Sequence, residues 1–219
     1  MTEPTRVPPD TSDMFAVHQV FRTSFDDPGR LVGTATAAGH DRVALVADYY
    51  ANVLAFLHVH HEGEDELVTP RLLDRVGDTA VVEQVSAQHI DVLSTIAECE
   101  AALATWAAAP DAATADALTA TLARLGRELG THLDDEEALI LPLCRDHLSA
   151  EEWGALPGHG MANFGGDKIW LILGLIREHM TDAQRAEMLA HMPPPAVEMW
   201  TTFGDQAFTD YVADLRQPT

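Results

Sequence analysis

Two short stretches of the chain carry histidine and glutamate four residues apart, a spacing that suits metal binding. Residues 60–70 read HHEGEDELVTP and residues 132–142 read HLDDEEALILP. Aligned without gaps, the copies share four residues and, at a fifth position, an acidic side chain: His60/His132, Glu64/Glu136, Asp65/Glu137, Leu67/Leu139 and Pro70/Pro142. Residues four apart lie on one face of a helix, so each copy directs an imidazole and a carboxylate the same way. One copy can arise by chance, but two with matching leucine and proline indicate a pair of metal-binding helices.

The apolar residues around these pairs predict that both pairs point into a helical core. The helix expected from about residue 40 to 73 has an apolar stripe at steps of three and four, and the helix carrying the second copy shows the same pattern. His60 and Glu64 continue the first stripe, and His132 and Glu136 continue the second.

Neighbouring residues on the first of these helices are assigned other roles. His58 and His61 each precede an acidic residue by four positions, but neither continues the apolar stripe. We therefore expect both at the flank of the site, beside the ligands and not among them. Tyr50 lies on the stripe, but ten residues before His60, which is roughly 15 Å along a helix. We expect Tyr50 in the core.

Two further predicted helices each place one histidine in an otherwise apolar stripe. These are His18, in a helix that begins near residues 10–13, and His89, in a helix that follows the turn at Gly77. Alone, His89 would more often be a hydrogen-bonded core histidine. In an up-down-up-down bundle, however, the starts of the first and third helices lie beside the ends of the second and fourth. Burying so many polar groups at one level is costly without a cation, so we predict a metal site at His18, His60, Glu64, His89, His132 and Glu136.

Composition and charge narrow the class of protein. The 219 residues suffice for one domain with a core plus an extension, and the alanine-rich residues 101–123 favour helix, so we expect an all-α fold. The 13 Lys and Arg against 35 Asp and Glu give a formal charge of −22, which makes nucleic acid and anionic membranes poor partners. Cys99 and Cys144 form no disulfide framework or thiolate zinc motif. We find no apolar run long enough to span a bilayer and no signal-peptide core, and we expect a cytoplasmic protein.

The donor set favours two metals. Four imidazoles and two carboxylates exceed what one tetrahedral zinc needs, and nitrogen and oxygen ligands suit iron or manganese. A ferritin-like di-iron bundle would require Glu-x-x-His pairs with two further glutamates. The doubled H-x-x-x-E-[DE]-x-L-x-x-P pattern, with inward histidines on the first and third helices, instead resembles the hemerythrin family, in its HHE cation-binding branch, over residues 13–147.

The resemblance implies a non-haem di-iron site, oxo- or hydroxo-bridged, in a four-helix bundle. His18 and His60 would serve one iron and His89 and His132 the other, with Glu64 and Glu136 bridging them. Hemerythrins proper carry a second histidine on the third helix, one turn from the first. Here the positions four away from His89 are Val85 and Leu93. One iron thus lacks a protein ligand or recruits one from elsewhere, and an open position is what permits chemistry on a small molecule.

The domain organisation follows from these assignments. We expect disorder over residues 1–10, the bundle over 11–148, and a C-terminal helical extension packed on the bundle over 149–219. Because the fourth helix ends at the metal end, the extension is expected to begin over the site and act as a lid. His147 or His159 could supply the missing ligand, although an exposed loop histidine is the more common case.

The leading functional hypothesis is a di-iron protein that binds or reacts with O2, NO or peroxide; as an enzyme it would be a peroxidase- or catalase-like oxidoreductase or an oxidase. A second hypothesis is an oxidase or oxygenase of a small organic substrate, which requires a substrate-sized pocket beside the metals. A third is an iron-storage or structural bundle, inert to oxygen and peroxide.

Overall fold

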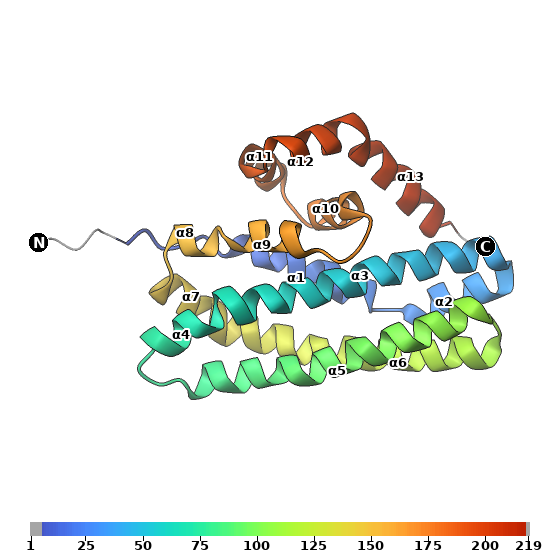
Figure 1. Cartoon of the computed structure of the whole chain (residues 1–219), viewed down its shortest axis with the longest axis horizontal. Helices are drawn as coiled ribbons and strands as arrows, with labels where there is room; N and C mark the ends of the chain where they lie inside the picture. The colour runs from blue at the N-terminus through green and yellow to red at the C-terminus, as the bar shows by residue number, and fades with distance from the viewer. Residues whose placement is uncertain (1–5, 218–219) are drawn as a thin grey trace, which may run out of the picture.

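The computed structural model describes residues 6–217, and within them the chain forms helices joined by turns, without a strand (Figure 1). The first part consists of α1 (Ser12–Ser24), α2 (Pro28–Ala38), α3 (His40–Leu67), α4 (Thr69–Arg75), α5 (Ala80–Ala108), α6 (Ala112–Asp135), the π-helical turn η1 (Glu136–Ile140) and α7 (Leu141–His147). The second part consists of α8 (Ala150–Trp153), α9 (Leu156–Asn163), α10 (Ile169–Glu178), α11 (Asp182–His191), α12 (Pro194–Met199), the π-helical turn η2 (Trp200–Gly204) and α13 (Asp205–Leu215). The prediction of an all-α protein is confirmed.

The break between α1 and α2 follows from local sequence. The Asp27 side chain accepts a hydrogen bond from the Arg30 backbone N–H, and Pro28 occupies the first turn of α2. Both residues are typical of a helix start. Gly39 then joins α2 to α3 with φ +103°, a left-handed conformation that glycine adopts without strain.

The proline of each repeat copy disturbs its helix at the same place. A proline has no N–H for the carbonyl four residues back and its ring crowds that carbonyl. In the first copy α3 stops at Leu67 and α4 restarts with Pro70 in its first turn. In the second copy α6 passes into η1, where the Leu141 N–H bonds to the Glu136 carbonyl, and Pro142 follows. Such π-helical turns are frequent at functional sites.

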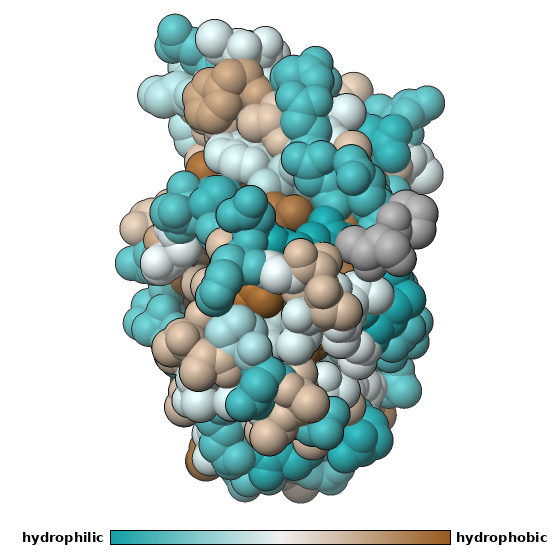
Figure 2. Space-filling view, turned by 90° about the vertical axis from the view of Figure 1, so that its right-hand side faces the viewer, coloured by the Kyte–Doolittle hydropathy of each residue, from teal (hydrophilic) through white to brown (hydrophobic). Residues whose placement is uncertain are grey.

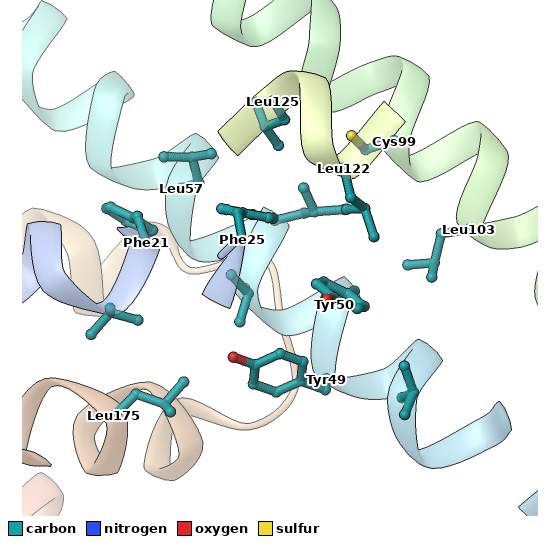
Figure 3. Close-up of a cluster of buried hydrophobic side chains, with 14 of the residues drawn as sticks. Phe21, Phe25, Tyr49, Tyr50, Leu57, Cys99, Leu103, Leu122, Leu125 and Leu175 are labelled. Carbon is teal, nitrogen blue, oxygen red and sulfur yellow. The ribbon is translucent and has the colours of Figure 1, made fainter. Parts of the chain in front are cut away.

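The core draws on both parts of the chain. Figure 3 shows apolar side chains from α1, α3, α5 and α6 meeting around Tyr50, with Leu175 of α10 beside them. Tyr50 is fully buried, as the sequence predicts. The extension therefore shares the hydrophobic core of the bundle.

Polar contacts also join the extension to α3. Asp48 on α3 accepts hydrogen bonds from Lys168 Nζ (2.7 Å) and from the Tyr211 hydroxyl (2.6 Å), and Asn52 Oδ1 accepts one from the Lys168 N–H (3.0 Å). In Figure 2, which faces the right-hand end of the view in Figure 1, the surface is mostly hydrophilic, with hydrophobic residues visible where the extension meets the bundle.

The segment at residues 6–10 lies beside the end of α7 and the start of α8. Arg6 donates to the carbonyls of Leu148 (2.6 Å) and Arg145 (3.1 Å), and the Ala150 N–H donates to the Val7 carbonyl (3.0 Å). The predicted disorder of residues 1–10 falls partly on residues 1–5, which are outside the described residues.

Within residues 6–217, one helical stretch, His40–Arg75, is long and apolar enough to cross a membrane by length and composition, contrary to the expectation that no apolar run would be. Half of its most apolar window is buried inside the fold. This is the pattern of a core helix, and it is consistent with a soluble protein.

The close approach of α1 to α6 depends on a glycine. A Cβ at Gly126 would lie 2.9 Å from the Phe25 carbonyl oxygen and 3.0 Å from the Phe25 Cβ. We expect Gly126→Ala to lower the free energy of unfolding by about 1–3 kcal/mol, the usual cost of overpacking, in urea titrations. Gly130→Ala is the matched control on α6, because nothing lies within 4 Å of its Cβ. Equal stability of both variants would contradict the tight contact.

Candidate metal centre

The structure brings all six predicted site residues together and adds a seventh. His18 comes from α1, His60 and Glu64 from α3, His89 from α5, His132 from α6, and Glu136 from the first position of η1. The added residue is His61 on α3. All seven side chains are buried or nearly so, the most exposed being His60 with 7% of its side-chain surface accessible.

These residues form two groups that could each hold a cation. One group is His18, His60, Glu64 and Glu136, and the other is His61, Glu64, His89 and His132. Within each group, one ligand atom from every residue lies within 4.8 Å of the others. Because Glu64 belongs to both groups, the two positions are adjacent.

Each glutamate lies between an imidazole of one group and an imidazole of the other. The Glu64 oxygens are 3.2 Å from His60 Nε2 and 3.6 Å from His89 Nε2. Glu136 Oε2 is 3.3 Å from His18 Nε2 and 3.7 Å from His132 Nε2. This placement suits carboxylates that contact two metal ions at once.

The expectation that His61 lies at the flank of the metal site is wrong. His61 is 0% exposed, and its ring centroid is 4.5 Å from that of His89 and 5.0 Å from that of His132. The reason is that the buried face of α3 is wider than one stripe, as the apolar face of a core helix usually is. A second stripe at steps of three and four is also buried, and this signal could have revealed His61: Leu54, Leu57, His61, Glu64 and Val68. His58 is exposed, in keeping with its assignment to the flank.

As the sequence shows, α5 lacks a second histidine one turn from His89. His61 lies beside His89 and can take the place of that missing ligand. The other candidates do not enter either group. His159 packs on the outer side of α3, with its ring 3.2 Å from the position of a Cβ on Gly63, and its Nδ1 is 3.6 Å from a Glu66 oxygen. His147 ends α7 and is half-buried.

Hydrogen bonds orient three of the imidazoles. Nδ1 of His18 donates to Glu137 Oε1, and Nδ1 of His89 donates to Asp65 Oδ1, each at 2.8 Å. Nδ1 of His132 donates to the Gln88 side-chain oxygen at 3.1 Å. These bonds leave Nε2 free for a metal, as outer partners of metal-binding histidines do. They also explain the acidic position that follows the glutamate in both repeat copies.

The buried polar atoms at the centre fit a cation. Eight atoms are buried without a hydrogen-bond partner among the described residues: Nε2 of His18, His60 and His132, both ring nitrogens of His61, both carboxylate oxygens of Glu64, and Oε2 of Glu136. Unsatisfied groups of this kind are costly and rare in folded proteins. Coordination to metal would satisfy them, so the residues present fit a metal pair.

Without metal, burial and neighbouring charges shift the pKa values of the cluster residues in different directions. Burial alone would lower the pKa of His18, but the carboxylates of Glu136 and Glu137 raise it to about 9. Burial, with His18 nearby, lowers the pKa of His60 to about 3. Burial and the neighbouring Glu136 raise the pKa of Glu64 well above its usual value. A cation would replace protons as the positive charge that balances the carboxylates.

Cation binding should therefore release protons and strengthen as pH rises. Below the pKa of His18, about 9, the cation must displace a proton from that imidazole, and Glu64 must also ionise. We expect the binding of a cation at pH 7 to release at least about one proton. The affinity for Mn²⁺ should rise about tenfold per pH unit for each proton displaced. Calorimetry in two buffers of different ionisation enthalpy counts these protons. An affinity independent of pH between 6 and 8 would contradict this expectation.

A small cavity adjoins the cluster. Its volume is about 20 Å³, and its lining includes Glu64, His89 and Glu136 together with Val68, Thr69, Leu72, Val82, Val85, Ser86 and Ile140. A site of about 10–15 Å³ in this measure holds one water, so the cavity has room for one or two heavy atoms.

Comparison of the sequence with models of known protein families also indicates that this part of the chain binds cations. Residues 10–144 match the model of the hemerythrin HHE cation-binding domain. Comparison with curated proteins and with solved structures gives no match. The matched range contains every residue of the two groups and more than half of the chain. On this match, and with a buried His and Glu cluster that could hold metal, the chain belongs to the hemerythrin HHE cation-binding family.

Proposed function

We propose that the protein holds two iron ions in one buried centre and there binds or reacts with O2, NO or peroxide. The observation that carries the proposal is the pair of four-residue groups that share Glu64 and have Glu136 between their imidazoles. Glu64 and Glu136 would be shared by the two ions, and an ion pair held in this way would also leave room for an oxo or hydroxo bridge.

In this proposal His18 and His60 serve one iron, and His61, His89 and His132 serve the other. Glu64 and Glu136 contact both. The helices that carry them, α1 with α2, α3 with α4, α5, and α6 with η1 and α7, form an up-down-up-down four-helix bundle. With two imidazoles in one group and three in the other, an ion held by His18 and His60 would have fewer protein ligands.

A bound iron pair supplies redox electrons and an open position for a small ligand. The protein supplies the rest. Asp65, Glu137 and Gln88 fix the direction of three imidazoles, and the apolar side chains around the cavity exclude bulk water. Because electrostatic interactions are stronger in such a site, Glu64 and Glu136 stay tightly associated with the cations.

The cavity size favours small guests over an organic substrate. Pockets for organic ligands usually measure about 300–1,000 Å³, whereas the cavity beside Glu64 and Glu136 measures about 20 Å³. A larger hollow of about 390 Å³ lies between α3 and α5, but it is lined by residues such as Ala47, Ala51 and Ala104 and by none of the seven cluster residues. An oxidase or oxygenase of an organic substrate is therefore disfavoured.

The proposed setting is the cytoplasm, with a small molecule as the partner. The formal charge of −22 disfavours nucleic acid and anionic membranes. These assignments rest on composition.

Reactivity of the iron-loaded protein tests the proposal. Addition of peroxide, NO or O2 to anaerobically loaded protein should change its optical spectrum stoichiometrically with protein. A spectrum that none of the three changes would support the storage or structural alternative and contradict the proposal.

A further inference from the structure

The cavity beside the metal cluster is lined by apolar residues and by five polar ones. Three of the five, Glu64, His89 and Glu136, belong to the cluster. The other two carry hydroxyls and belong to neither cation-binding group: Thr69 at the start of α4 and Ser86 on α5. Val68, Leu72 and Val82 lie among the remaining wall residues.

These hydroxyls have no assigned structural role. Neither the Thr69 nor the Ser86 side chain forms a hydrogen bond to another group within residues 6–217, whereas hydroxyls such as Thr105 bond to a carbonyl of their own helix. Both residues are half-buried. They come from two different elements that the interruption at Pro70 brings to the same cavity.

The two hydroxyl residues and three cluster residues line the same small cavity. It has room for one or two heavy atoms, and a polar guest in such a space needs several hydrogen-bond partners. A guest that accepts hydrogen bonds would find donors in the two hydroxyls. An apolar diatomic would gain nothing from them.

We propose that Thr69 and Ser86 determine the specificity of the centre, by favouring small guests that accept hydrogen bonds, such as peroxide or a small anion, over apolar diatomics. The inference rests on the proposed function and deepens it. Neither residue is a metal ligand, and both act on the guest through their hydroxyl groups.

The test compares ligand binding to the iron-loaded protein in wild type and in the double variant Thr69→Val, Ser86→Ala. Valine keeps the shape of threonine and alanine nearly that of serine, so the change removes the hydroxyls alone. The probes are cyanide, an anion of two heavy atoms that accepts hydrogen bonds, and NO, which also has two heavy atoms. We expect the cyanide affinity to fall about tenfold, the scale of a hydrogen bond to a charged group, and the NO affinity to stay within about twofold.

Control measurements separate this inference from the proposed function. Thr105→Val, an exposed site on α5, should leave both affinities unchanged, and iron content per chain should be equal in all variants. A second variant, Ser86→Leu, fills the cavity and should slow the association of both probes. Equal changes for cyanide and NO in the double variant, no change for cyanide, or unaltered association in Ser86→Leu would overturn this inference while leaving the iron centre in place. A wild type that takes up no iron would remove the proposed function as well.

Discussion

Replacing His61 with leucine should make the metal-free protein more stable and its metal binding weaker. The His61 ring is fully buried with both nitrogens unpaired, and burial lowers its pKa well below the usual value. Leucine is an apolar residue that suits this position, because Leu133 occupies the equivalent place in the second repeat copy and is 0% exposed. Removing an unsatisfied buried polar group should raise the free energy of unfolding without metal by about 1–3 kcal/mol.

The same substitution removes one of the three imidazoles around one cation position. Removing a residue that hydrogen-bonds to a metal ligand typically lowers metal affinity by about 10–100-fold. Removing the ligand His61 itself should therefore lower the Mn²⁺ affinity of the position formed by His61, Glu64, His89 and His132 by at least about 100-fold. Urea denaturation of the metal-free protein and equilibrium dialysis with Mn²⁺ measure the two effects. His58→Leu is the matched control, since it makes the same change at an exposed position on α3. A lower free energy of unfolding together with an unchanged Mn²⁺ affinity would indicate that His61 has a packing role only.

Replacing Glu64 with alanine should abolish the pair of cation positions. Glu64 is the residue that belongs to both groups, and its two oxygens face imidazoles of different groups. Without this carboxylate neither position keeps its full donor set. Glu136 is then the one carboxylate left in the two groups to balance the charge of two cations. We expect fewer than about one iron per chain after reconstitution, against about two in wild type.

Elemental analysis after gel filtration measures this loss. Glu62→Ala, at an exposed position of the same helix, should retain the wild-type iron content. Two irons per chain in Glu64→Ala would contradict the shared role of this carboxylate.

The sequence predicts much of the site because helices impose a fixed period on the chain. His60 with Glu64, and His132 with Glu136, are recognisable from a spacing of four within an apolar stripe, and the structure buries all four. His18 could be found from its place on a stripe alone. The helix start at Pro28 and the turn at Gly39 are equally local, because each depends on residues next to it in the chain.

Other features of the site and the fold depend on how the helices pack against one another. The spacing of apolar residues along one helix does not contain this information. His61 was missed because the buried face of α3 is wide enough to include adjacent residues, so a single stripe describes only part of it. The pairing of Gln88 with His132, and of Asp48 with Tyr211, joins residues far apart in the chain. The expected helix over about residues 40–73 is interrupted between Leu67 and Thr69, and α6 passes into a π-helical turn at Glu136, a detail that the spacing of apolar residues does not encode.

The repeat also explains why the two halves of the centre resemble each other. In each copy the glutamate faces the imidazole of an adjacent helix, and the acidic residue that follows it accepts from that same imidazole: Glu136 and Glu137 with His18, Glu64 and Asp65 with His89. His61, opposite Leu133 in the alignment, breaks this symmetry. The two cation positions are thus expected to differ in affinity.

The most direct test of the centre is the number of irons per chain after anaerobic reconstitution, with the optical spectrum recorded after exposure to air. We expect about two irons per chain and an absorption typical of iron ions joined by oxo and carboxylate bridges. A single metal ion per chain, or no stoichiometric metal, would contradict the shared role of Glu64 and Glu136 and the function proposed for them.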